Sequence, residues 1–291
     1  MKLSVSSYSY NQYLKDGRLS QLDCVRIAHE MGFDAIEFTD ILPKEDLAEQ
    51  KRAAERIRKE ADRLGMPINA YTIGACLYHD TAEAVEAEVA RLKGQLEVAS
   101  ILGASVMRHD VCYALGTHGT ARSFDLMLPT IADAARRVSA YAETLGIRTC
   151  TENHGFIAQD SDRVERLFNA VAHDNYGLLV DIGNFLCADE DPAIAVSRVA
   201  PYAVHAHVKD FYKSEQPIEG GFMTRGANYL VGAVPTEGVV PVRRCLAILA
   251  RAGYDGFVSL EYEGLEDCMT AIPRGLSNVR AILAELPAKK K

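Results

Sequence analysis

The sequence predicts an α/β protein, residues 1–291, folded as a single (β/α)8 barrel domain. Strand-like and helix-like segments alternate from one end of the chain to the other. Eight segments have the pattern of buried strands, and they recur at roughly 35-residue intervals, the length of one strand–helix unit. No linker rich in Pro, Gly or Ser divides the chain. An open doubly wound sheet is the alternative, but it usually has fewer strands, and "SSYSYNQYLKDG" is no Gly-rich nucleotide-binding turn.

The predicted strands are short apolar runs, several of which end in ionisable side chains. They comprise residues 3–8, 35–40, 68–73, 105–110, 148–153, 177–183, 203–211 and 256–264.

The segments between the strands predict amphipathic helices. They are rich in Ala, Leu, Glu and Arg, as in "EDLAEQKRAAERIRKEADRLG", and carry apolar residues at helical spacing. Recurring phrases such as "EMGFDAIEF" and "ILGASVMRH" supply a C-cap Gly, a turn and the next strand. The longest stretch without a regular pattern is 212–240, after the seventh strand. A loop of this length in a compact domain is usually functional, so we expect a lid over the site.

The composition indicates a globular protein with a sizeable core, because 48% of the residues are hydrophobic and 25% are charged. The net charge of −8 argues against a nucleic-acid partner, and the only basic run is the terminal "AKKK". No apolar stretch approaches the roughly 20 residues of a membrane span, and "MKLSVSSYSY" lacks the features of a secretory signal. Seven scattered Cys form no CxxC motif. We therefore expect a cytoplasmic protein with reduced thiols and no membrane partner.

Ionisable residues stand near the C-terminal ends of the last four predicted strands. These are Glu152, Asp181, His207 and Glu261. The active site of a (β/α)8 barrel lies at this end, so the four side chains should converge there. Three carboxylates in a partly buried mouth repel one another and require a compensating charge, which a divalent cation supplies. Oxygen-rich ligation with one His favours manganese, magnesium or cobalt over a structural zinc.

The two-residue period of a strand predicts which neighbours share a face with these ligands. Glu152 and His154 lie on one face of the fifth strand, and His205, His207 and Lys209 lie on one face of the seventh. His154 and Lys209 are expected near the mouth, where they can bind a polar substrate. His205 is expected deeper, as a packed, hydrogen-bonded residue.

The first four strands offer weaker candidates. Tyr8, Glu37, Tyr71 and His109 stand at or near their C-terminal ends. Tyr71 could equally belong to the core, and Glu37 could pair with Arg or Lys. His109 is preferred, because its neighbours in "MRHDV" should occupy the opposite pleat and leave it facing inward.

The motifs "TENHG", "VDIGN", "HAHVKD" and "SLEYEG", in that order on the last four strands, resemble the sugar phosphate isomerase/epimerase superfamily of xylose isomerase-like TIM barrels. This superfamily includes ketose 3-epimerases, hydroxypyruvate isomerases and inosose dehydratases. The resemblance spans nearly the whole chain and implies one divalent cation, often manganese, on the four strand-end ligands. It also implies that Glu152 and Glu261 act as acid and base on opposite faces of a sugar, and that Arg225 contacts the substrate.

One position departs from the pattern of ketose 3-epimerases, which have a His three residues after the metal-binding Asp. This chain has Asn184 there, which can orient a hydroxyl group but cannot carry a proton at neutral pH. The departure weakens the case for free-ketose epimerisation and leaves the superfamily assignment intact.

The expected chemistry begins with removal of a proton from the carbon beside a carbonyl that a cation polarises. A sugar isomerase or epimerase, which returns the proton, is the main prediction. A lyase that eliminates a β-substituent from a keto-glycoside or inosose is the alternative, and a non-catalytic sugar-binding barrel is the second. A DNA-repair endonuclease of this barrel type would need more His ligands and a basic face. The partner is thus a small sugar or sugar derivative, and a homo-oligomer is compatible with the sequence.

Overall fold

The computed structural model describes residues 1–113 and 123–286, and eight parallel strands in it close into a barrel. The "AKKK" run lies outside the described residues. The barrel strands are β1 (Lys2–Ser6), β2 (Ala35–Thr39), β3 (Ile68–Ile73), β4 (Val106–His109), β5 (Arg148–Glu152), β6 (Tyr176–Asp181), β7 (Ala203–Val208) and β11 (Phe257–Leu260). Closure occurs between β1 and β11, where Leu3 stands opposite Val258 and Val5 opposite Leu260. The predicted (β/α)8 fold is confirmed.

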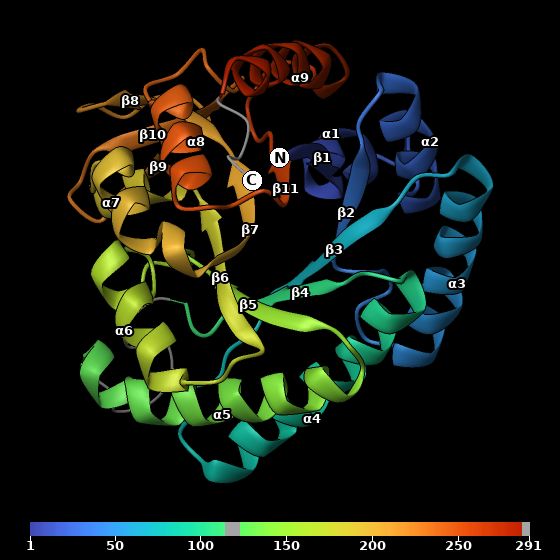
Figure 1. Ribbon diagram of the computed structural model, residues 1–291, viewed down its shortest axis with the longest axis vertical. Coiled ribbons are helices and arrows are strands. Elements are labelled where there is room, and N and C mark those ends of the chain that lie inside the picture. Colours follow the sequence, from blue (N-terminus) through green and yellow to red (C-terminus); the bar gives the residue numbers. More distant parts are fainter. Residues whose placement is uncertain (114–122, 287–291) are drawn as a thin grey trace.

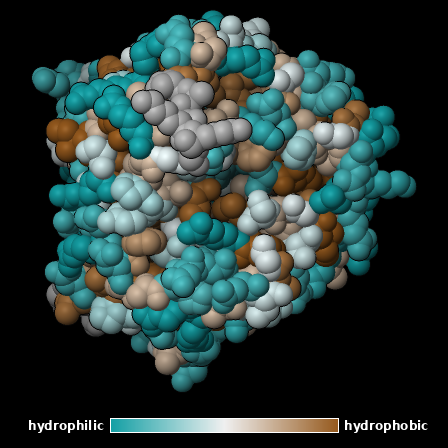
Figure 2. Space-filling model, in the orientation of Figure 1, coloured by the Kyte–Doolittle hydropathy of each residue, from teal (hydrophilic) through white to brown (hydrophobic). Residues whose placement is uncertain are grey.

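The helices surround the barrel as an outer layer (Figure 1). They are α1 (Asn11–Lys15), α2 (Gln21–Met31), α3 (Leu47–Leu64), α4 (Ala82–Leu102), α5 (Phe124–Thr144), α6 (Ser161–Val171), α7 (Pro192–Val199), α8 (Val242–Arg251) and α9 (Cys268–Glu285), with short 3-10 helices η1 (Ser7–Tyr10), η2 (Asn184–Ala188) and η3 (Ala200–Tyr202). Hydrophilic residues dominate the outer face seen in Figure 2, and hydrophobic residues gather there in small patches. The amphipathic helices contribute apolar residues to the core, as α2 does with Val25 and Ile27 and α6 with Val164 and Leu167.

The helix boundaries follow the capping signals in the sequence. Helix α2 begins with a capping box, in which Ser20 and Asp23 bond each other's backbone N–H groups. Helices α2, α3 and α4 end at Gly32, Gly65 and Gly103, whose φ angles of 86°, 64° and 74° lie in the left-handed region. A residue with a Cβ adopts that conformation only at a cost, which explains the glycine in these turns.

The segment 212–240 is more regular than the sequence predicts. Strands β8 (Asp210–Ser214), β9 (Phe222–Met223) and β10 (Tyr229–Ala233) form a separate antiparallel sheet in the order β8–β10–β9. The predicted strand 203–211 therefore divides at Lys209, where the chain leaves the barrel for the small sheet. The predicted strand 3–8 likewise ends at Ser6, and η1 follows. Among the described residues, no helix is long and apolar enough to cross a membrane.

A buried carboxylate and a glycine attach the small sheet to the barrel. Asp210 accepts hydrogen bonds from the backbone N–H groups of Phe211, Thr236, Gly238 and Val240, at 2.8–2.9 Å. Strand β10 passes so close to the segment after β11 that a Cβ at position 232 would lie 2.6 Å from the backbone of Glu263. Gly232 therefore permits the contact that places this sheet beside the end of β11.

Candidate metal centre

The structure brings the four strand-end ligands together. Glu152, Asp181, His207 and Glu261 each offer one ligand atom, and these atoms all lie within 4.8 Å of one another. Measured from His207 Nδ1, the nearest carboxylate oxygens are 3.4 Å away on Glu261, 3.8 Å on Asp181 and 3.9 Å on Glu152. The four residues are between 0% and 6% exposed. The predicted convergence at the C-terminal end of the barrel is thus present.

The unsatisfied atoms of the cluster suit a cation. Asp181 Oδ2 and His207 Nδ1 are buried and have no hydrogen-bond partner. Burial raises the pKa of Asp181 to about 7, and the carboxylates of Glu152 and Glu261 contribute to the increase. Such groups are costly to leave unpaired in a protein interior. A divalent cation among the four residues would satisfy them, and three carboxylates with one imidazole form an oxygen-rich ligand set.

The turn after β6 fixes the orientation of Asp181. Its Oδ1 accepts the backbone N–H groups of Gly183 (2.8 Å) and Asn184 (3.0 Å), so Oδ2 faces the other ligands. The Asn153 side chain bonds both backbone groups of Asp181 at 2.9 Å and thereby joins the ends of β5 and β6. A Cβ at Gly183 would lie 2.7 Å from the carbonyl oxygen of Lys209, which explains the glycine in "VDIGN".

Lys209 provides positive charge beside the ligands. Its Nζ lies 2.6 Å from Glu261 and 3.6 Å from Asp181, and only 7% of its side chain is exposed. Burial alone would lower the pKa of Lys209, but Glu261, Glu263 and Asp181 raise it well above the ordinary value. Lys209 is thus buried among the ligands, and its contact with a substrate stays a prediction.

The side chains of β4 point to the opposite faces of the sheet from those that the sequence predicts. Arg108 points into the barrel, where its guanidinium pairs with Glu152 and Asp110. His109 lies on the other face of β4, with its ring centroid 6.5 Å from that of Tyr176, which itself packs on Phe168 of α6. The prediction that His109 faces inward is therefore wrong. "MRHD" has ionisable residues in both phases, so the alternation alone could not decide between them.

Asp110, which follows β4 and also faces inward, contacts His154 through its carboxylate. His154 Nδ1 lies 3.0 Å from Asp110 Oδ1, and 38% of the His154 side chain is exposed. Burial lowers the pKa of this imidazole, but the Asp110 carboxylate outweighs that effect and raises it above the ordinary value. Tyr113 donates a hydrogen bond to Asp110 (2.8 Å) and packs edge-on against His154. His154 thus stands at the mouth, as predicted. Its neighbours Arg108 and Asp110 also face inward, although the sequence predicts that they occupy the outer face of β4.

The other predicted substrate contacts lie at different depths. Asn184 donates to Glu152 Oε1 (2.8 Å) and accepts from Lys209 Nζ (3.4 Å), so it belongs to the cluster. Tyr8 lies in η1 and is half-buried, and Glu263 and Glu261 act with burial to raise its pKa. Arg225 donates to Asp160 Oδ2 (2.6 Å) and to the carbonyl oxygen of Phe156 (2.5 Å), which places it at the rim formed by the β5–α6 connection.

Of the weaker set, Glu37 lies beneath the ligands, whereas Tyr71 packs against α4. Glu37 is fully buried, with its carboxylate 2.6 Å from His205 Nε2 and 2.9 Å from His207 Nε2. Its partners are thus histidines rather than Arg or Lys. His205 is buried and hydrogen-bonded, as expected. Tyr71 is a core residue whose hydroxyl bonds Gln95 at 2.7 Å.

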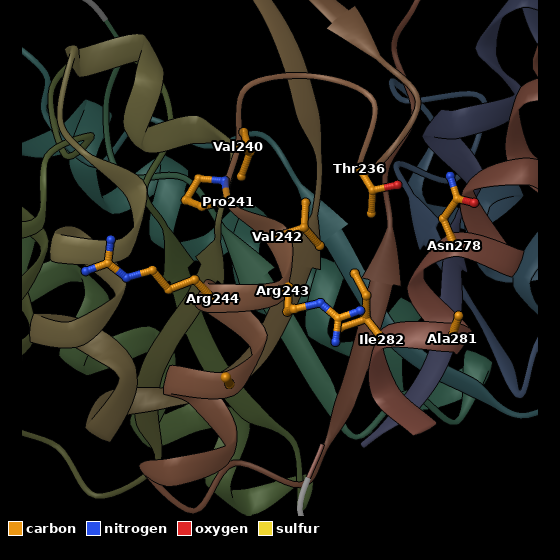
Figure 3. Close-up of a pocket in the computed structure, with 10 residues that line it drawn as sticks. Thr236, Val240, Pro241, Val242, Arg243, Arg244, Asn278, Ala281 and Ile282 are labelled. Carbon is orange, nitrogen blue, oxygen red and sulfur yellow. The ribbon is translucent and has the colours of Figure 1, made fainter. Parts of the chain in front are cut away.

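A separate pocket lies away from the ligand cluster. A space of about 670 Å³ opens between α8, α9 and the segment before α8 (Figure 3). The residues that line it include Thr236, Val242, Arg243, Asn278 and Ile282. None of the four predicted metal ligands lines it. Arg243 extends toward Ile282, and Arg244 points away (Figure 3). The candidate site is therefore assigned by the ligand cluster and not by pocket size.

Known proteins resemble this chain in part of the sequence or in the fold. Inosose dehydratase from Lacticaseibacillus casei is 25% identical over 138 residues, which are 46% of either chain, so the match spans about half the length of that relative. The structure of IOLI protein with a bound zinc atom superposes with a TM-score of 0.77 at 17% identity, covering 99% of this chain and 100% of that one. A D-psicose 3-epimerase determined in the presence of D-fructose superposes with a TM-score of 0.74 at 16% identity, covering 97% and 99%.

The family model of the xylose isomerase-like TIM barrel matches residues 25–282, which include all four predicted ligands. This match covers most of the chain and agrees with the closed eight-stranded barrel. The chain belongs to the xylose isomerase-like TIM barrel family.

Proposed function

We propose that this protein is a divalent-metal-dependent dehydratase that acts on a polyhydroxylated ketone. It removes the proton from the carbon beside the carbonyl and eliminates water from the neighbouring position. The inosose dehydratases that match half of the chain support this lyase reading. Glu152, Asp181, His207 and Glu261 would hold the cation, for which manganese suits the oxygen-rich ligand set. The cation would stabilise the negative charge that develops on the substrate when the proton leaves.

The single observation that carries the proposal is the His154–Asp110 pair at the mouth of the barrel. The buried Asp110 carboxylate raises the pKa of this partly exposed imidazole, which lies two residues beyond Glu152. Elimination of a hydroxyl group requires such a proton donor, because hydroxide is a poor leaving group. His154 would give its proton to the departing hydroxyl, which leaves as water.

The geometry favours Glu261 over Glu152 as the base. Glu152 has both oxygens engaged, because Oε2 contacts Arg108 and Oε1 accepts the amide of Asn184 at 2.8 Å. The contacts of Glu261 with Lys209 Nζ (2.6 Å) and His207 Nδ1 (3.4 Å) are both made by Oε2, so Oε1 can face the substrate. In the proposed reaction Glu261 takes the carbon-bound proton, and Lys209 and Asn184 contact the substrate oxygens.

Epimerisation is the second candidate, because it uses the same ligands and a D-psicose 3-epimerase shares the fold. In that reaction Glu152 and Glu261 would exchange protons with opposite faces of the substrate. The two candidates differ in the composition of the product, since epimerisation loses no water.

The test is a screen of inososes, keto sugars and keto-glycosides with manganese in deuterium oxide, with products identified by NMR. We expect an unsaturated or diketone product that has lost water. An epimer with unchanged composition would replace the dehydratase by the second candidate. Neither product nor deuterium incorporation from any of these compounds would favour a sugar-binding barrel.

The variant His154→Gln separates the two proton transfers. We expect water loss to fall by about 100-fold or more while deuterium exchange beside the carbonyl persists, because Glu261 is intact. His29→Gln, on the exposed side of α2, serves as the matched control and should behave like the unaltered protein. Unchanged water loss in His154→Gln would remove His154 from the reaction.

A further inference from the structure

An ionisable side chain lies below the four ligands, on the side away from the mouth of the barrel. We call this region the floor of the site, and none of the proposed substrate contacts involves it. Glu37 comes from β2 and reaches β7, on the far side of β1 and β11 in the sheet order. It is 0% exposed, and all its close polar partners are side chains of the barrel interior. A carboxylate so fully removed from water is costly unless donors surround it.

Three donors converge on the Glu37 carboxylate. Its Oε2 accepts from His205 Nε2 (2.6 Å) and from the Ser259 hydroxyl (2.9 Å). His207 Nε2 lies 2.9 Å from Oε1 and 3.1 Å from Oε2. Ser259 is in turn 2.5 Å from the hydroxyl of Ser4 on β1, so this network connects β1, β2, β7 and β11.

The contact with Glu37 determines which nitrogen of His207 can bind a cation. An ionised carboxylate only accepts hydrogen bonds, so the nitrogen that faces it must carry a proton. That nitrogen is Nε2, which leaves the lone pair on Nδ1. Nδ1 is the atom that faces Glu152, Asp181 and Glu261.

We propose that Glu37 is the positioning residue of the cation site, which fixes His207 with Nε2–H toward the floor and Nδ1 toward the cation. His205 supports the arrangement, because its ring meets the His207 ring edge-on at 85° with the centroids 5.4 Å apart. Carboxylate partners of this kind set the tautomer and the ring orientation of metal-bound histidines. The inference rests on the cation site of the proposed function and not on the reaction carried out there.

A second cation is the competing possibility, since Glu37, His205 and His207 also have ligand atoms within 4.8 Å of one another. The short contacts favour protons over metal at this place. His205 Nε2 and Glu37 Oε2 are 2.6 Å apart, the separation of a direct hydrogen bond, which leaves no room for an ion between them. The chain should therefore bind one cation and not two.

Calorimetric titration of the metal-stripped protein with manganese tests the proposal. We expect one ion per chain, and an affinity about 10–100-fold lower in Glu37→Gln, because the amide lacks the charge and presents a donor to one histidine. Ser259→Ala is the matched control, since it removes one hydrogen bond to Glu37 but keeps the pair with His207, and its affinity should stay within about 3-fold of the unaltered protein. Glu37→Asp, which keeps the charge, should recover part of the loss.

The outcomes separate this inference from the proposed function. No manganese binding by the unaltered protein would overturn the cation site itself. Equal affinity in Glu37→Gln and the unaltered protein would overturn the positioning role alone. Two ions per chain, one of them lost in Glu37→Gln with the other unaffected, would identify Glu37 as a ligand of a second site.

Nitrogen NMR of the unaltered protein gives a readout that a general loss of stability would not move. With labelled histidine and diamagnetic zinc bound, the His207 signals, assigned by comparison with His207→Gln, should show a proton on Nε2 and none on Nδ1. A proton on Nδ1 would contradict the proposal even if Glu37→Gln fails to fold.

Discussion

At the scale of single residues, the site depends on the phase of short strands. Glu152, Asp181, His207 and Glu261 could be predicted because each stands at the end of an apolar run, where an ionisable side chain would be costly to bury without a function. The sequence did not predict which residues of β4 face inward, because Arg108 and His109 are adjacent and either could occupy the inner face. The ion pair of Arg108 with Glu152 decides it, since this contact joins two strands and leaves no trace in the local sequence.

The same contact network predicts a pH dependence. The pKa of His154 is raised by Asp110, so its proton is present below that raised value and is lost as the pH increases through it. If His154 is the acid, turnover should decline at alkaline pH because the imidazole loses this proton. Asp110→Asn removes the charge, and we expect the alkaline limb of the kcat/KM profile to move to lower pH.

Tyr113→Phe provides the control for this prediction. It removes the hydrogen bond to Asp110 but leaves the carboxylate charge and the aromatic contact with His154. Its alkaline limb should therefore move much less than that of Asp110→Asn. An alkaline limb that is the same in all three proteins would show that another group carries the proton.

At the scale of elements, the strands were easier to predict than the connection after β7. The barrel strands are local apolar runs. Their limits differ from the prediction mainly at the C-terminal ends, where the polar residues belong to loops instead of strands. The segment 212–240 contains "YLVGAV", but Gly and charged residues interrupt the pattern around it. Its sheet forms through pairing of β10 with both β8 and β9 and through the hydrogen bonds to Asp210, which are tertiary effects.

Asp210 should therefore control the stability of this connection. In Asp210→Ala four backbone N–H groups lose their acceptor, and we expect a loss of about 3 kcal/mol in the free energy of unfolding, measured by denaturant titration. Asp191→Ala is the matched control, because Asp191 caps α7 through a single N–H group and should cost about 1 kcal/mol. Equal losses in the two variants would mean that the small sheet is held by other contacts.

At the scale of the whole molecule, barrel closure and function are linked through charge. Alternation of strands and helices predicts the closed barrel, and closure brings residues from β2, β5, β6, β7 and β11 to one place. The carboxylates gathered there oppose folding unless positive charge accompanies them. Lys209 and Arg108 supply part of it from within the chain, and the unsatisfied Asp181 Oδ2 and His207 Nδ1 mark what remains.

The metal-stripped protein should thus become less stable as the pH rises. Asp181 has its pKa raised by burial from 3.8 to about 7, so the folded state holds a proton that the unfolded state has lost, and stability declines between these values. The pKa of His207 is also raised, because Glu37 and Glu261 outweigh the effect of burial, and this contribution is lost above the ordinary value of 6.5. Stability therefore declines with rising pH from about pH 5 to pH 8, through Asp181 in the lower part of this range and His207 in the upper part.

Thermal melts across that range, with chelator and with manganese, test this balance. We expect the melting temperature of the stripped protein to fall with increasing pH, and manganese to raise it most at pH 8, where the ligands no longer hold protons that compete with the ion. At 100 times the dissociation constant the ion should add about 2.7 kcal/mol. Asp181→Asn removes the titrating carboxylate, so its stripped form should show a weaker decline. If manganese leaves the melting temperature unchanged at every pH, the buried carboxylates are balanced by Lys209 and Arg108 alone.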